Sequence, residues 1–159
     1  MSIRVGDRIP STVLSQMKDG QPVNIDTNDY FSGRKVVLFA VPGAFTPTCS
    51  AYHLPGFVEN AADFFAKGID AIACMAVNDV FVMHAWGEHA GAGNIDMLAD
   101  GNGDFTRALG LELDGTSFGM GTRSQRFALI AEDGIVTRLM VEAPGEFRVS
   151  SADSVLASI

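Results

Sequence analysis

The chain has 159 residues, of which 47% are hydrophobic and 19% charged, and this composition predicts one globular domain over residues 1–159. Its 11 Lys and Arg stand against 19 Asp and Glu, a net charge of −8, so we expect no nucleic acid and no membrane as a partner. The two cysteines, Cys49 and Cys74, are too few for a disulfide scaffold. Because neither a secretory leader nor a bilayer-spanning apolar run accompanies them, they predict a reducing compartment, the cytoplasm.

The predicted elements alternate between strands and helices. We expect an N-terminal hairpin turning around residues 18–22, strands at 36–41, 69–77 and 95–99, helices at 47–67, 79–89 and 105–109, a hairpin of strands 127–131 and 135–141 around Asp133-Gly134, and a last helix at 151–159. Pro55-Gly56 is expected to kink the long helix. This order predicts an α/β protein with a thioredoxin-like fold, in which helices flank a central mixed sheet and the N-terminal β-hairpin extends it.

Cys49 follows the first buried strand, at the start of the long helix. Thr46 is a suitable N-cap, Pro47 suits the first helical position, and Cys49 then occupies the third. Unpaired backbone N–H groups and the positive end of the helix dipole surround that position and favour thiolate over thiol. A thiolate there, beside the hydroxyl of Thr46 or Thr48, is a candidate nucleophile. The alternative is a structural cysteine in a loop near the core.

Several segments together resemble a known family. The run Val41–Ser50, with Pro42, Thr46 and Cys49, resembles the peroxidatic motif of peroxiredoxins. The segments 52–57, 77–82, 98–105 and 126–134, with Trp86, are similar to the type II, or peroxiredoxin-5-like, subfamily. The resemblance covers nearly the whole chain and implies a thioredoxin fold with an inserted N-terminal hairpin.

The resemblance also implies site residues. Cys49 would attack the peroxide as a thiolate and become a sulfenic acid, Thr46 would hydrogen-bond substrate and thiolate, and Arg126 would supply a fixed cation. Arg123, three residues earlier, is the rival for the arginine's role.

The resemblance places three further residues in the substrate pocket. Pro42 would shield the sulfur from water, and the backbone N–H of Thr48 would help to hold the peroxide. His53 lies one helical turn beyond Cys49, where it could influence the site; a partly exposed helix histidine is the alternative reading. We expect no metal and no cofactor, because the histidines and cysteines do not have the spacing of a zinc site.

The catalytic cycle is expected to need an outside thiol. Many relatives carry a resolving cysteine near the C-terminus, but the corresponding stretch, residues 146–151, has none. Cys74 is a possible secondary thiol, although its strand-like surroundings favour a core residue. The resemblance therefore implies a one-cysteine mechanism with glutathione and glutaredoxin, or thioredoxin, as reductant.

The expected function is that of an antioxidant enzyme of cell redox homeostasis. It would be a peroxiredoxin, an oxidoreductase that reduces hydrogen peroxide and organic hydroperoxides. The subfamily implies a homodimer with aromatic residues near the active-site loop at the contact; Phe45, Phe81 and Trp86 are the candidates, with a core position as the alternative for each. A different class of function stays open: a non-enzymatic redox sensor or holdase, in which oxidation of Cys49 changes partner binding.

Overall fold

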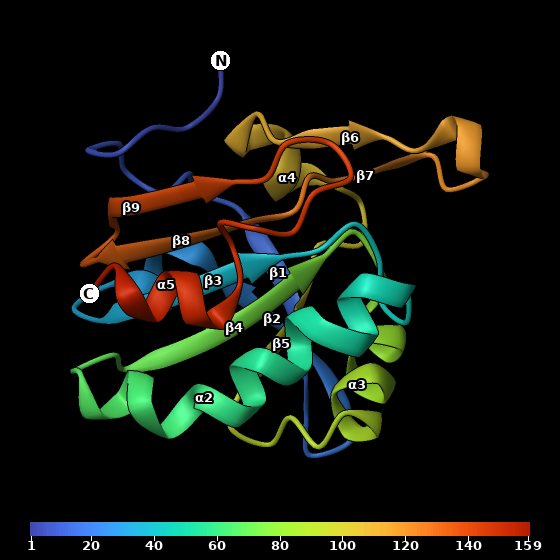
Figure 1. Ribbon diagram of the computed structural model, residues 1–159. Coiled ribbons are helices and arrows are strands. Elements are labelled where there is room, and N and C mark those ends of the chain that lie inside the picture. The colour runs from blue at the N-terminus through green and yellow to red at the C-terminus, as the bar shows by residue number, and fades with distance from the viewer.

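Figure 1 shows the fold in a computed structural model of the chain, which describes residues 1–159. A seven-stranded mixed sheet has the strand order β2-β1-β5-β4-β3-β8-β9, and β6 and β7 form a separate two-stranded sheet. The strands are β1 (Val13–Lys18), β2 (Gln21–Asp26), β3 (Lys35–Ala40), β4 (Ala71–Ala76), β5 (Asp96–Ala99), β6 (Glu112–Asp114), β7 (Thr122–Ser124), β8 (Phe127–Glu132) and β9 (Ile135–Val141). The helices are α1 (Thr27–Phe31), α2 (Leu54–Ala66), α3 (Val80–His89), α4 (Asp104–Leu109) and α5 (Ala152–Ala157), with the short helical turns η1 (Cys49–His53) and η2 (Thr116–Phe118).

The central strand β3 separates two apolar cores. Side chains alternate across a strand, so Val37 and Phe39 enter one core while Val36 and Leu38 enter the other. Helices α2, α3 and α5 cover the first core, and α1 and α4 cover the second (Figure 1). Burial on both faces explains why this strand is a continuous apolar run in the sequence.

Both predicted hairpins are confirmed. The turn between β1 and β2 has positive φ at Asp19 (51°) and Gly20 (77°), and the turn between β8 and β9 has positive φ at Asp133 (50°) and Gly134 (79°). Asp-Gly with both residues left-handed is the pair that a two-residue hairpin turn favours. The N-terminal hairpin joins the edge of the main sheet through an antiparallel bridge from Ser15 to Ala99. The thioredoxin-like architecture predicted from the element order is therefore present.

The sequence patterns miss three elements. Helix α1 is only five residues long and begins with Asp26 as its N-cap, which accepts hydrogen bonds from the backbone N–H groups of Asn28 and Asp29. Strands β6 and β7 have three residues each, too few to show a period. They form an arm beside α4 that projects from the body of the molecule (Figure 1). No helix is both long and apolar enough to span a bilayer.

Candidate active site

Strand register brings Cys49 and Arg126 together. Strands β3 and β8 pair antiparallel with Ala40 opposite Phe127, so the end of β3 lies beside the start of β8. The loop that leaves β3 leads into the helix that carries Cys49, and Arg126 immediately precedes β8. Two residues separated by 77 positions therefore meet at one edge of the sheet.

The helix starts where the sequence predicts, but its capping differs. Helical structure begins at Pro47, and the Thr46 carbonyl accepts from the N–H of Ser50 at 2.8 Å. The predicted side-chain cap is wrong, because the Thr46 hydroxyl donates to the Gly43 carbonyl at 2.7 Å. The hydroxyl is thereby held in the loop that leaves β3.

The irregularity of the long helix lies at Cys49, upstream of the predicted kink. Residues Cys49–His53 form a π-helical turn in which the N–H of Leu54 donates to the Cys49 carbonyl. Pro55, the next residue, has no N–H, and its ring would crowd the carbonyl four residues back in a regular α-helix. A wider π turn before the proline avoids that clash, and such turns are frequent at functional sites.

Arg126 holds the sulfur of Cys49 and the ring of His53 at the same time. Its Nη2 donates to Cys49 Sγ at 3.0 Å, and its Nη1 donates to His53 Nδ1 at 2.8 Å. Arg123 does not compete for this position, because its guanidinium donates to the carbonyls of Met120 (2.9 Å) and Val77 (3.1 Å). The planar fork of an arginine suits this two-pronged contact.

His53 is a buried, neutral histidine with one tautomer. Its Nε2 lies 2.9 Å from the Ser150 carbonyl, which can only accept, and its Nδ1 faces Arg126, which can only donate. The proton therefore sits on Nε2. Burial, followed by the positive charge of Arg126, lowers the pKa of His53 to about 3. The alternative of a partly exposed helix histidine is wrong, because His53 is fully buried.

The low pKa of His53 predicts a pH-dependent stability. The unfolded chain takes up a proton at this residue below its ordinary pKa of 6.5, whereas the folded protein does so only near pH 3. The contribution to the free energy of unfolding is therefore complete above pH 6.5 and falls as the pH drops towards 3, by up to about 1.4 kcal/mol per pH unit. Urea unfolding at a series of pH values should show this slope in the wild type and a shallower one in His53→Asn. The exposed His89 supplies the control His89→Asn, and equal slopes in wild type and His53→Asn would contradict the assignment.

Glu142 anchors the segment that carries Ser150. Its carboxylate accepts from the backbone N–H groups of Arg148 (2.9 Å), Val149 (2.8 Å) and Ser150 (2.8 Å), and from the Ser150 hydroxyl (2.7 Å). Burial raises the pKa of Glu142, but these hydrogen bonds outweigh it and the pKa lies below its ordinary value. The Glu142 N–H also donates to the Arg126 carbonyl at 3.0 Å.

Sequence reasoning missed Glu142, Ser150 and Phe147 as parts of this site. The centroid of the Phe147 ring lies 4.9 Å from the centroid of the His53 ring and 5.6 Å from Cζ of Arg126. The available signal was an acidic residue directly after an apolar strand and before Pro144-Gly145. A carboxylate at that position can accept hydrogen bonds from the backbone N–H groups of the segment that follows the turn, residues 148–150.

A cavity of about 520 Å³ opens beside this centre. Pro42, Thr48 and Arg126 line it. His53 does not line it, because it is fully buried and hydrogen-bonds to Arg126 from within the protein. A part for His53 beside the substrate stays a prediction. Cys49 itself is fully buried and does not line the cavity.

Cys74 belongs to the core. It lies in β4 opposite Phe39 of β3, and it is fully buried in the same apolar cluster as Cys49. Burial, followed by the nearby Cys49, raises the pKa of the Cys74 thiol well above its ordinary value. Both cysteines are free, and Cys74 stays a neutral thiol.

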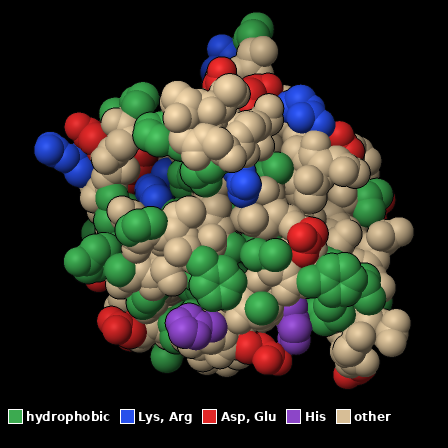
Figure 2. Space-filling view, turned by 90° about the vertical axis from the view of Figure 1, so that its right-hand side faces the viewer, with side chains coloured by type: hydrophobic (Ala, Val, Ile, Leu, Met, Phe, Trp, Pro, Cys, Tyr) green, Lys and Arg blue, Asp and Glu red, His purple; other side chains and the backbone are tan.

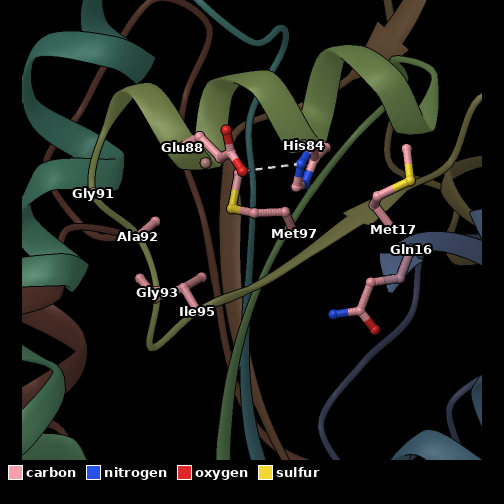
Figure 3. A pocket seen from close by; sticks show the side chains of 10 residues that line it. Gln16, Met17, His84, Glu88, Gly91, Ala92, Gly93, Ile95 and Met97 are labelled. Atoms are coloured by element: carbon pink, nitrogen blue, oxygen red, sulfur yellow. Dashed lines mark ion pairs between the residues drawn. The ribbon is translucent and has the colours of Figure 1, made fainter. Parts of the chain in front are cut away.

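A second cavity, of about 400 Å³, lies between α3 and the strands β1 and β5 (Figure 3). Its lining includes Gln16, Met17, Met97 and an ion pair between His84 and Glu88 at 3.1 Å. It shares no residue with the cavity beside Arg126. Cys49 lines neither cavity, but Arg126, which donates to its sulfur, lines the first.

Known proteins match the chain along nearly its whole length. The Redoxin family matches residues 4–156. Peroxiredoxin-2E-2, chloroplastic, of Oryza sativa subsp. japonica is 51% identical over 99% of this chain and 73% of its own length. Peroxiredoxin-2B of Arabidopsis thaliana is 46% identical over 99% of this chain and 98% of its own length. Among solved structures, reduced Prx3 of Vibrio vulnificus in complex with H2O2 is 53% identical, with a TM-score of 0.96 and 98% of each chain covered.

These matches agree with the fold and with the resemblance carried by the segment around Cys49. Identity of 46% over 99% of this chain leaves no large part of the chain outside the likeness. A TM-score of 0.96 shows that the backbone follows the same course as that of a peroxiredoxin. The chain belongs to the peroxiredoxins, in their type II branch, and is a thiol-dependent peroxidase.

Proposed function

We propose that Cys49 is the peroxidatic cysteine of this peroxidase. The observation that carries the proposal is the hydrogen bond of 3.0 Å from Arg126 Nη2 to Cys49 Sγ at the start of a helix. A guanidinium and the N-terminal end of a helix both stabilise a negative sulfur. A neutral thiol that only packs in the core gains little from a guanidinium 3.0 Å from its sulfur, whereas a thiolate is stabilised by it.

The reaction follows from this geometry. The Cys49 thiolate attacks one peroxide oxygen, the S–O bond forms as the O–O bond breaks, and the leaving oxygen departs as hydroxide or alkoxide and takes up a proton. The sulfur is oxidised to sulfenic acid and the peroxide is reduced to water or an alcohol. Arg126 stabilises the thiolate and then the charge that develops on the leaving oxygen. Thr46 turns its hydroxyl from the Gly43 carbonyl to the bound peroxide, and the N–H of Thr48 holds it from the first helical turn.

An external thiol completes the cycle in this proposal. The support is that Cys74 is buried and protonated, and that the stretch 146–151 contains no cysteine. We propose glutathione with glutaredoxin, or thioredoxin, as reductant.

The test is peroxide consumption by the reduced protein with each reductant system in excess. Many turnovers per Cys49 with at least one of them are expected, whereas one peroxide consumed per chain in every system would favour the redox sensor instead.

The apolar lining of the cavity beside Arg126 favours organic hydroperoxides as substrates in addition to hydrogen peroxide. Its wall includes Leu113, Phe118, Met120 and Pro144, and Phe118 is 81% exposed at the tip of the β6–β7 arm. An exposed apolar side chain at the mouth gains from contact with an organic substituent.

Phe118→Ala should raise the KM for cumene hydroperoxide several-fold, because about 1 kcal/mol of apolar contact corresponds to about a fivefold change. The KM for hydrogen peroxide should stay unchanged. Phe65→Ala, on α2 and outside the cavity, is the control. A loss of the same size for both peroxides would contradict this substrate range.

A homodimer is proposed from exposed aromatic side chains. Phe45 and Phe81 are 48% and 63% exposed, and Figure 2 shows hydrophobic side chains gathered on the face below the β6–β7 arm. Trp86 is fully buried, so of the three candidate aromatics it is a core residue. Phe45 also has a left-handed φ of 64°, a costly conformation for a bulky residue that directs its ring to the rings of Trp86 and His89.

Sedimentation equilibrium should give twice the mass of the chain, and a Phe81→Arg variant should give a monomer.

We propose that residues 1–159 act as one domain in a reducing compartment. The support for the domain is that both cores pack against the same central sheet. The support for a reducing compartment is the pair of free cysteines. The cytoplasm is our proposal; a fluorescent fusion of the full-length protein located in another compartment would contradict it.

A further inference from the structure

Glu142 is a buried carboxylate without a cation. Only 6% of its surface is exposed, and none of the four ion pairs in the structure includes it. A charge removed from water needs hydrogen bonds to compensate for its lost hydration. Glu142 obtains them from one short segment, residues 148–150. The carboxylate therefore fixes the conformation of that segment.

The fixed segment contacts the catalytic centre through Ser150. While the N–H and hydroxyl of Ser150 donate to Glu142, its carbonyl accepts from His53 Nε2 at 2.9 Å. His53 Nδ1 then accepts from Arg126, whose other nitrogen donates to Cys49 Sγ. Each link is a hydrogen bond of 2.7 to 3.0 Å. The path from Glu142 to the reacting sulfur is continuous.

We propose that Glu142 is a positioning residue for peroxide reduction, which acts by holding the Ser150 carbonyl on His53 so that His53 aims Arg126 at Cys49. The proposal rests on the peroxidatic role of Cys49. Without the Ser150 carbonyl, the ring of His53 can rotate or exchange tautomers, and a proton on Nδ1 would oppose the Arg126 donor. Arg126 Nη1 would then lose its acceptor, His53 Nδ1, and the guanidinium would no longer be held in its orientation.

Two other features beside the Glu142 carboxylate support this role. Its N–H donates to the Arg126 carbonyl, so it also restrains the backbone of the arginine. Phe147, which lies between Glu142 and the anchored segment, packs its ring against both His53 and Arg126. The loop that Glu142 closes thus contacts both His53 and Arg126 through Phe147.

The test replaces Glu142 by glutamine, which has the same shape but presents an amide in place of the carboxylate. The rate constant for oxidation of Cys49 by hydrogen peroxide should fall about 10- to 100-fold, as expected for a small displacement of catalytic groups. Its pH profile should move to higher pH, because a misaligned Arg126 stabilises the thiolate less. Glu132→Gln, an exposed carboxylate at the far end of β8, is the matched control and should leave both rate and profile unchanged.

A double-variant cycle separates positioning from general destabilisation. His53→Asn places an amide oxygen near Nδ1 but cuts the link to Ser150. In that background Glu142→Gln should have no further effect on the rate, although it still lowers the urea midpoint. An unchanged rate and pH profile in Glu142→Gln would overturn the proposal and leave a structural role. Additive rate losses in the double variant would overturn the path through His53.

A milder variant covers the case in which Glu142→Gln does not fold. Glu142→Asp keeps the charge but withdraws it by one methylene group, and a partial loss of rate is expected; an unchanged rate would overturn the proposal. Failure of the peroxidatic role itself is distinguishable, because the wild-type protein would then show no oxidation of Cys49 at all.

Discussion

We expect Cys49→Ser to abolish peroxide turnover. A serine hydroxyl is not ionised at neutral pH even beside Arg126, and oxygen cannot take the place of sulfur in the sulfenic acid intermediate. The rate of peroxide consumption under excess dithiothreitol should fall to that of the reagent alone. Because Cys49 is fully buried, the substitution can also lower stability. The urea midpoint of Cys49→Ser should therefore be measured to check that the variant is folded.

Cys74→Ala is the matched control for that experiment. Cys74 is also a fully buried cysteine of the same apolar cluster, and alanine avoids burying a hydroxyl without a partner. We expect this variant to keep most of its turnover under dithiothreitol and under the preferred biological reductant. A folded Cys74→Ala variant that turns over under neither reductant would overturn the one-cysteine mechanism.

Arg126→Ala should lower the rate constant for oxidation of Cys49 by about 10²- to 10³-fold, the cost typical of removing a donor aimed at developing charge. Arg126→Lys should be intermediate, because lysine keeps the positive charge but lacks the fork that holds Cys49 Sγ and His53 Nδ1 together. Stopped-flow measurement of Cys49 oxidation by hydrogen peroxide gives these constants.

The control for Arg126 is Arg138→Ala, which removes an exposed arginine on β9 that donates to the carbonyls of Thr137 and Ser158 and makes no contact with Cys49. Its rate constant should equal that of the wild type. If Arg126→Lys matched the wild type, the charge alone would suffice and the two-pronged geometry would have no catalytic part. If Arg126→Ala matched it, Arg126 would have no part in the chemistry.

The sequence predicts those features that depend on neighbouring residues. The hairpins at Asp19-Gly20 and Asp133-Gly134, the apolar strand β3 and the helix start at Pro47 all follow from local propensity and pattern. Cys49 could be singled out for the same reason, because its place in the first helical turn is a local property.

Features that depend on contacts distant in the sequence were predicted less well. The Thr46 hydroxyl donates to the Gly43 carbonyl in a loop that contacts Asn78, between β4 and α3, and Trp86 of α3. The tie between His53 and Ser150 joins residues 97 positions apart. It depends on the path of the chain after β9, and Glu142 determines that path.

The choice between Arg123 and Arg126 shows how a local ambiguity is settled by topology. Both residues lie just before β8, and composition does not separate them. Pairing of Ala40 with Phe127 puts the residue immediately before β8 against the Cys49 loop. Arg123 lies in β7 and is held by the carbonyls of Met120 and Val77.

We expect peroxide to oxidise Cys49 to a sulfenic acid. The most direct measurement is to mix the reduced protein with one equivalent of hydrogen peroxide, trap with dimedone and analyse the peptides by mass spectrometry. We expect one dimedone adduct per chain, on the peptide that contains Cys49, and an unmodified Cys74. An unmodified Cys49, or a disulfide between Cys49 and Cys74 in place of the adduct, would contradict the account.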